Sequence, residues 1–249
     1  MGALLARLVD DAALCPPGRA PMDGALAAHR DAGHDPVVGR LLCPASRFAE
    51  LRARLVPEDL LDLGVIADAG IDGLSETLDA VHAEPRVRPS AVRIALPEDA
   101  DQARAAAVTL ARLPPGVPAH IEVRHSPGWR DALDRVRAAR DHGAPLAAAF
   151  RVTGPPTELA TSITACAARD LAFTCAATDH HPHILLAAAL AATGERDVRR
   201  TLERTDLRGL TADLRALTEP EALATRRLLL AFSAPDIRAA LTRLNPAAA

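Results

Sequence analysis

Short β-like runs recur along this chain at nearly even intervals, and this rhythm limits the folds that the chain can adopt. There are six of them, at residues 37–43, 62–67, 91–96, 119–124, 146–152 and 171–177. Their starts lie roughly 25 to 29 residues apart, which is the length of one strand, one helix and two loops. The spacing predicts repeated βα units with parallel strands.

The segments between the runs carry helix signals. Pro97-Glu98-Asp99 precedes an alanine-rich stretch, and Pro155-Pro156-Thr157-Glu158 precedes another helical stretch. Because a parallel sheet is covered on both faces, an open doubly wound sheet competes with a closed barrel. No G-x-G-x-x-G or G-x-x-x-x-G-K-[ST] motif follows any run, which disfavours the nucleotide-binding open sheets. We therefore predict an α/β fold resembling a TIM barrel.

The rhythm falters after Thr193. Two charged stretches, at residues 195–204 and 218–227, read as helices. A short strand is expected at Leu207–Leu210 and a longer one at residues 228–232. We therefore expect a barrel that is irregular or incomplete around its seventh strand. Residues 1–35 precede the first run and read as two helical pieces around a Pro-Pro-Gly turn. They predict an N-terminal helical cap on a single domain of residues 1–249.

Composition narrows the function. All 29 basic residues are arginine, so this chain supplies no lysine for a Schiff base or as a general base. A net charge of −3 and 2% aromatic residues argue against a nucleic-acid partner. The longest uncharged aliphatic run is too short to span a bilayer, and the N-terminus does not read as a signal peptide. We expect a cytoplasmic protein without a membrane partner.

The four cysteines do not indicate a metal site. Cys15, Cys43, Cys166 and Cys175 are widely spaced and form no C-x-x-C or Cys/His zinc pattern. They are expected to be buried free thiols. Alternation along its strand points Cys175 away from the barrel interior, which argues against its acting as a nucleophile.

Alternation along the runs also predicts which polar side chains face the barrel interior. In the fourth run His120, Glu122 and Arg124 share one face, while Ala119 and Ile121 share the other. The apolar set must pack on helices, so the polar set belongs inside. The same reasoning places three further arginines and one threonine inside: Arg40, Arg93, Arg151 and Thr174.

This interior allows two interpretations. In the structural one, Arg93 or Arg40 forms a buried ion pair with Glu122. In the functional one, arginines in excess over the acid bind an anionic ligand at the barrel mouth. Asp68, which follows the second run, would lie at the same end as a second acid, or would cap the following helix.

A histidine cluster, residues 178–183, follows the sixth run directly. Active sites of such barrels lie at the carboxyl ends of the strands, so the cluster locates a candidate site. Neutral imidazoles at a helix N-terminus can bind metal, act as a general base or polarise a carbonyl. His180 would be the base and His181 the orienting group, while a metal would use His181, His183 and Asp179. No cofactor is required by the sequence, and a divalent metal is the second hypothesis.

Several stretches resemble an uncharacterised family of bacterial barrel-like proteins. The resemblance is carried by short blocks over most of the chain: residues 10–17, 38–47, 62–68 and 173–182. It implies a barrel fold and no particular activity. Relatives have a lysine within the segment that corresponds to residues 149–154 and another at Thr174, and both are absent here, whereas His180-His181-Pro182 is retained.

Three hypotheses for function follow. The first is a lyase- or isomerase-type enzyme acting on a small carboxylate or phosphate compound, with Arg151 and Arg124 holding the anion and Glu122 or His180 moving a proton. The second is a metal-dependent hydrolase or lyase that uses the histidine cluster. The third is a catalytically degenerate barrel that binds a metabolite or a protein.

Overall fold

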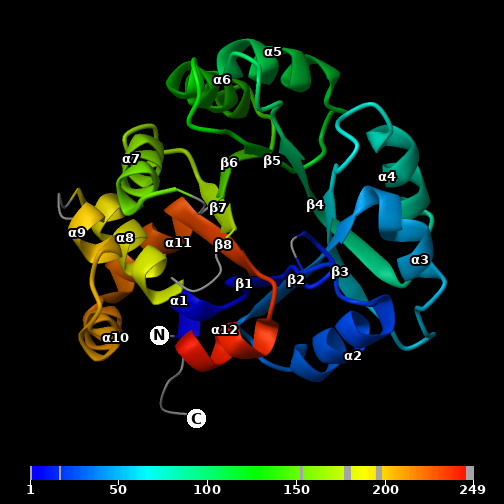
Figure 1. The fold of residues 1–249 in the computed structure, drawn as a ribbon, viewed down its shortest axis with the longest axis horizontal. Helices are drawn as coiled ribbons and strands as arrows, with labels where there is room; N and C mark the ends of the chain where they lie inside the picture. The colour runs from blue at the N-terminus through cyan, green and yellow to red at the C-terminus, as the bar shows by residue number, and fades with distance from the viewer. Residues whose placement is uncertain (1, 17, 152–153, 177–180, 195–197, 245–249) are drawn as a thin grey trace.

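The eight strands of the protein form one closed barrel. The computed structural model describes residues 2–16, 18–151, 154–176, 181–194 and 198–244. The strands are β1 (Val9–Asp11), β2 (Val38–Pro44), β3 (Leu61–Ile66), β4 (Val87–Ala95), β5 (Ala119–Glu122), β6 (Leu146–Arg151), β7 (Phe173–Ala176) and β8 (Leu229–Ala234). Every neighbouring pair is parallel, and β8 pairs with β1 to close the ring (Figure 1). The predicted TIM-barrel fold is confirmed.

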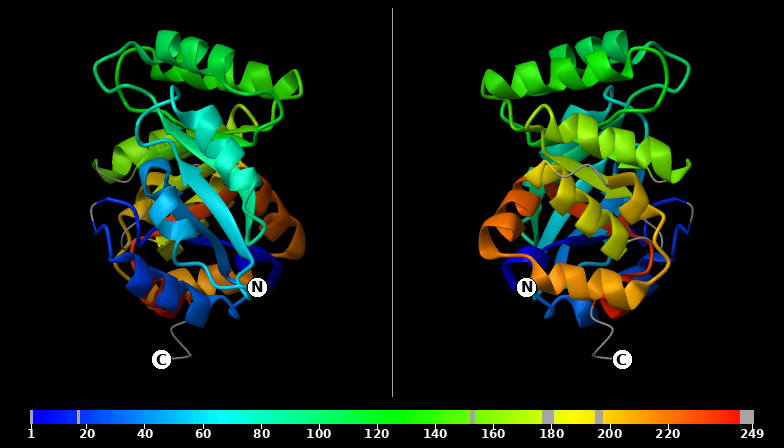
Figure 2. Two further views of the ribbon diagram at one scale, coloured as in Figure 1. Left: turned by 90° about the vertical axis from the view of Figure 1, so that its right-hand side faces the viewer. Right: turned by 90° about the vertical axis from the view of Figure 1, so that its left-hand side faces the viewer.

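Helices surround the ring of strands. They are α1 (Gly2–Leu5), α2 (Met22–Ala32), α3 (Phe48–Arg52), α4 (Leu74–His82), α5 (Gln102–Arg112), α6 (Trp129–Asp141), α7 (Pro156–Ala167), α8 (His181–Thr193), α9 (Val198–Leu202), α10 (Leu207–Ala216), α11 (Glu219–Leu228) and α12 (Ile237–Leu244), with a short 3₁₀ turn, η1 (Ala45–Arg47), before α3. Figure 2 shows α5 and α6 side by side at one edge of the molecule.

The six predicted runs coincide with β2 to β7, and the strand predicted at residues 228–232 coincides with β8, but the sequence interpretation of the N-terminal segment omits a strand. Residues 1–35 contain β1, which pairs with both β2 and β8, so this segment is part of the barrel wall as well as a source of helices. The histidine cluster therefore follows the seventh strand, not the sixth. Two of the three residues of β1 are aspartates, which strands usually disfavour.

The expected short strand at Leu207–Leu210 is wrong, because these residues begin α10. Leu210, Thr211 and Leu214 are buried, which is the three-to-four residue spacing of one helix face. Four helices, α8 to α11, connect β7 to β8, and β8 then pairs directly with β7. The barrel is therefore closed where an incomplete ring was one expectation, while the alternative expectation of an irregularity there is confirmed by a register shift in the β7–β8 pairing.

An aliphatic core lies between the strands and the helices. Strand residues of the outward set, such as Leu41, Leu63, Ile94 and Ile121, are fully or almost fully buried. Removing this apolar surface from water is the main stabilising contribution to such a fold. All four cysteines are buried and free, as expected. Among the described residues no helix is long and apolar enough to cross a bilayer.

Candidate functional site

The barrel interior holds a polar cluster contributed by several strands, which we call the interior cluster: Asp10, Arg40, Arg93, His120, Glu122, Thr174 and Ser233. Arg93 lies at its centre and is only 9% exposed. Its guanidinium donates hydrogen bonds to the hydroxyl oxygens of Thr174, at 3.2 Å, and Ser233, at 3.3 Å. Burial lowers the pKa of Arg93, and the nearby Glu122 and Asp10 carboxylates oppose this effect. Within the described part of the chain, Arg93 forms no ion pair with a carboxylate.

The expected pairing of Arg93 or Arg40 with Glu122 is wrong. Arg40 pairs instead with Asp10: its Nη2 lies 2.6 Å from Oδ2, and its Nε and backbone N–H donate to Oδ1 at 3.0 Å. The carboxylate of Asp10 is almost fully buried, so it needs this compensation. The acid that pairs with Arg40 lies on β1, the strand that the sequence did not reveal.

His120 faces the same interior, as its alternation predicts. It is 8% exposed, and burial lowers its pKa well below the usual value, with Arg40 and Arg93 adding to the effect. The imidazole is therefore neutral near pH 7. A cavity of only about 10 Å³ lies beside His120, Arg40 and Arg93, which is room for about one water molecule. This cavity is too small to hold a metabolite beside these groups.

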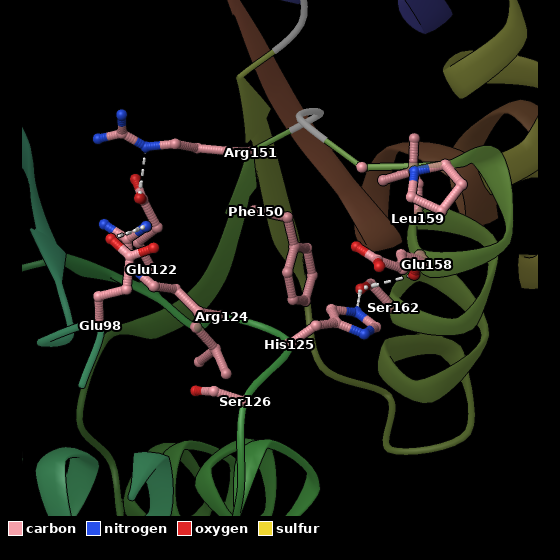
Figure 3. Close-up of a pocket in the computed structure, with 13 residues that line it drawn as sticks. Glu98, Glu122, Arg124, His125, Ser126, Phe150, Arg151, Glu158, Leu159 and Ser162 are labelled. Carbon is pink, nitrogen blue, oxygen red and sulfur yellow. Dashed lines mark hydrogen bonds and ion pairs between the residues drawn. The ribbon is translucent and has the colours of Figure 1, made fainter. Parts of the chain in front are cut away.

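A larger cavity of about 270 Å³ opens at the carboxyl ends of β5 and β6, against α7 (Figure 3). We call it the rim cavity. Its polar lining comes from five elements or loops: Glu98, Glu122, Arg124, His125, Ser126, Arg151, Glu158 and Ser162. Its apolar lining includes Val123, Phe150 and Leu159. This is the end of the barrel at which enzymes of this fold carry their chemistry.

The structure brings Glu122, Arg124 and Arg151 together in the rim cavity. Arg151 donates from Nε to Oε1 of Glu122 at 2.6 Å, and the Glu122 side chain is 3% exposed. Arg124 lies 3.3 Å from the exposed Glu98 and donates from Nε to the carbonyl oxygen of Leu96 at 3.4 Å. Arg124 and Arg151, the two arginines that were expected to hold an anion, thus each form an ion pair with a glutamate.

Arg151 keeps most of its hydrogen-bonding capacity. Only Nε is used for Glu122, and the two terminal nitrogens have no partner among the described residues. Figure 3 shows them directed away from Glu122. The side chain is 47% exposed, so a ligand can reach it. A guanidinium with a free pair of terminal nitrogens matches the two oxygens of a carboxylate or phosphate.

His125 is a polar residue of the rim cavity that the sequence interpretation did not select. Its Nε2 lies 2.6 Å from Oγ of Ser162, and that hydroxyl donates to the carbonyl oxygen of Glu158 at 3.1 Å. Nε2 therefore carries the proton, which leaves Nδ1 as the basic nitrogen. The ring stacks on Trp129 with centroids 4.4 Å apart. These contacts fix both the tautomer and the ring plane.

The charge state of His125 suits a base. Burial lowers its pKa from the ordinary value; the carboxylate of Glu158 opposes the shift and the cation of Arg130 adds to it. The ring is consequently neutral near pH 7. Strand β5 ends at Glu122, so alternation no longer applies at His125 and its loop turns the ring towards α7. The sequence interpretation did not select His125 because it extended the strand pattern to residue 124 and did not place the end of β5 at Glu122.

The remaining predicted residues do not join the rim cavity. Asp68 accepts hydrogen bonds from the backbone and hydroxyl of Ser46, which ties the loop after β3 to η1. His183 is buried at the start of α8, and its Nε2 donates to the carbonyl oxygen of Arg204 at 2.6 Å. Asp179 and His180 lie outside the described residues, as does the side chain of His181, so their roles stay predictions.

A metal centre has no support in the described part of the chain. No group of three or more His, Cys, Asp or Glu side chains lies close enough together there to hold an ion. Cys175 is fully buried, and burial raises the pKa of its thiol to about 12, with Arg93 opposing. It points away from the interior cluster, as expected for a structural thiol.

Comparisons of the chain with protein-family models, curated proteins and solved structures found no match. A TIM-barrel fold by itself does not decide the function, because this fold carries many unrelated activities.

Proposed function

We propose that the protein is an enzyme that acts on a small anionic metabolite, bearing a carboxylate or phosphate, by proton transfer at the rim cavity. This is the chemistry of lyases and isomerases. The observation that carries the proposal is Arg151, a half-exposed residue of the cavity lining: Glu122 holds its guanidinium through Nε, and both terminal nitrogens have no partner among the described residues. Arg124 lines the same cavity as a second cation.

Two side chains in the cavity carry the chemistry of proton transfer. His125 is held as a neutral imidazole with Nδ1 basic, by Ser162 and Trp129. Glu122 orients Arg151 and supplies a carboxylate beside it. A neutral imidazole on one side of the cavity, with a cation that binds the substrate anion on the other, suits abstraction of a proton from the bound substrate.

We include the histidine cluster, residues 178–183, in this proposal because it follows β7, the strand that pairs with β6. Ala176, the last residue of β7, is the register partner of Arg151 on β6. His180 and His181 follow that strand end in sequence, as base and orienting group. The resemblance to the uncharacterised barrel family, with its retained His-His-Pro, is a further part of the proposal and names no reaction.

The test is a screen of small carboxylates and phosphates, followed by thermal unfolding and by mass spectrometry for product. We expect one class of anion to raise the unfolding temperature and to be converted. Arg151→Ala should remove both effects, and Glu122→Gln should remove conversion. Arg88→Ala is the matched control, because Arg88 is also an exposed, ion-paired strand arginine but lies at the amino end of β4.

Three results separate the hypotheses. Stabilisation without conversion by any anion would leave a binding barrel and remove the enzyme. Equal responses of wild type and Arg151→Ala would remove the rim cavity as the site. Stoichiometric zinc, manganese or iron in protein purified without added metal, lost with His183→Ala, would favour the metal-dependent alternative instead.

A further inference from the structure

Among the described residues, the rim cavity has a guanidinium with unpartnered terminal nitrogens on one side and a carboxylate without an ion pair on the other. Figure 3 shows Arg151 and Glu122 on one side, Glu158 and His125 on the other, and the ring of Phe150 between them. The first side comes from β5 and β6, and Glu158 comes from the first turn of α7. A ligand that fills the cavity therefore meets a cationic group at one end and an anionic group at the other.

Glu158 is the carboxylate of this lining that has no cationic partner. Glu122 is paired with Arg151 and Glu98 with Arg124. Glu158 is exposed and forms no ion pair within the described part of the chain. Its carboxylate lies against Gly154, where an added Cβ would meet it, so the side chain folds back along the edge of the cavity. A carboxylate with free acceptor oxygens is a partner for a ligand cation.

Apolar surface separates the two charges. Val123, Phe150 and Leu159 line the cavity, and each is largely buried, so they form a fixed apolar wall. Such a wall favours an aliphatic segment in the ligand over a further polar group. A purely anionic ligand would leave Glu158 facing it without compensation, and a purely cationic one would leave the Arg151 fork unused.

We infer that the rim cavity selects a zwitterion: a small molecule with a carboxylate or phosphate at one end, a protonated amine at the other and a short aliphatic spacer between them. This inference rests on the proposed anion site and specifies its substrate class. Arg151 binds the anionic end through its terminal nitrogens. Glu158 binds the ammonium end, and the spacer crosses Phe150.

The experiment uses matched probes that differ only in their charged ends. These are ε-aminocaproate, caproate and hexylamine, with γ-aminobutyrate and butyrate as a shorter series, titrated into the full chain and followed by NMR chemical shifts. We expect the amino acid of at least one length to bind about tenfold more tightly than its matched acid, the gain from one charge-assisted hydrogen bond. Hexylamine should bind most weakly.

Variants assign the two ends. Glu158→Gln should abolish the preference for the amino acid while leaving the affinity for caproate unchanged. Arg151→Ala should weaken both acids. Glu76→Gln is the matched control, because Glu76 has the same place in the first turn of α4 and is exposed without an ion pair within the described residues. It corrects for any loss of helix stability at that position.

The outcomes distinguish this inference from the proposed function. Equal affinity for the amino acid and its matched acid, both weakened by Arg151→Ala, would overturn the zwitterion and keep the anion site. An amino-acid preference that Glu158→Gln leaves intact would also overturn it. No binding of any acid in either series, or acid binding that Arg151→Ala does not change, would remove the anion site itself.

Discussion

At the scale of single residues, the barrel interior is held by charges whose partners lie on distant parts of the chain. Asp10 and Arg40 join β1 to β2, and Glu122 and Arg151 join β5 to β6. Arg93 is buried and donates hydrogen bonds to the hydroxyl groups of Thr174 and Ser233. Removing one member of a buried pair leaves the other charge without compensation, which costs more than the pair contributes.

The Asp10–Arg40 pair gives the first prediction at this scale. Asp10→Ala should lower the free energy of unfolding by about 3–5 kcal/mol, because it leaves the guanidinium of Arg40 without its carboxylate in the interior. Asp31→Ala removes the acid of an exposed pair with Arg238 and should cost at most about 1 kcal/mol. Urea unfolding measures both values. Equal losses in the two variants would show that the interior pair is not buried as described.

His120 gives a pH prediction. Burial lowers its pKa well below 6.5, so the native protein excludes a proton that the unfolded chain accepts. Stability from this group is present above about pH 6.5 and is lost as the pH falls towards the native pKa, by about 1.4 kcal/mol per pH unit. His120→Gln should remove this part of the slope in urea unfolding between neutral and mildly acidic pH. Exposed His34→Gln is the control, and an unchanged slope in His120→Gln would contradict a buried neutral ring.

At the scale of elements, close backbone contacts position the strands that carry the interior cluster. On β2, a Cβ at Gly39 would lie 2.6 Å from Oδ1 of Asp10 and 3.2 Å from the backbone oxygen of Arg7. Gly24 on helix α2 has nothing within 4 Å of its added Cβ. A side chain at Gly39 would therefore clash with its surroundings, whereas one at Gly24 would have open space.

The two glycines make a matched prediction. Gly39→Ala should destabilise the protein by about 1–3 kcal/mol, because the methyl group displaces the Asp10 carboxylate from Arg40. Gly24→Ala should stabilise it by about 0.5–1 kcal/mol, because alanine restricts the unfolded chain and favours the helix. Thermal unfolding ranks them. Destabilisation of similar size in both would argue against the packing described at β2.

The sequence predicted most elements because two patterns were strong. Even spacing identified β2 to β7, and period-two alternation placed Arg93, His120 and Thr174 inside the barrel. Strand β1 was missed because it is three residues long and contains adjacent aspartates. Its acids are tolerated only through tertiary contacts: Asp10 with Arg40, and Asp11 with the Nδ1 of His29 at 3.1 Å. No local pattern reveals such partners.

The candidate site was predicted only in part, for a related reason. Glu122, Arg124 and Arg151 lie near the ends of adjacent strands, so alternation brought them together. His125 and Glu158 depend on where β5 ends and on how α7 packs against it, which are matters of three-dimensional packing. Asp68 and His183 had suitable chemistry at suitable ends of strands and helices, but each is engaged with neighbouring segments.

At the scale of the whole molecule, the cavities among the described residues are small inside the barrel and larger at its ends. The interior cavity has room for about one water molecule, whereas the rim cavity has about 270 Å³ at the carboxyl end. A cavity of similar size, about 260 Å³, lies at the amino end beside α4 and is lined mainly by apolar residues, including Pro89 and Pro118. Of these two cavities, only the rim cavity is lined by charged side chains that form ion pairs.

The most direct test of this account is the location of anion binding, mapped by backbone NMR during titration with succinate. We predict saturable shifts confined to residues near 96–98, 122–126, 150–151 and 154–162, which are lost in Arg151→Ala and kept in Arg88→Ala. Saturable shifts centred instead on residues 89–92 and 115–118, or a full response that persists in Arg151→Ala, would contradict the rim cavity as the functional site.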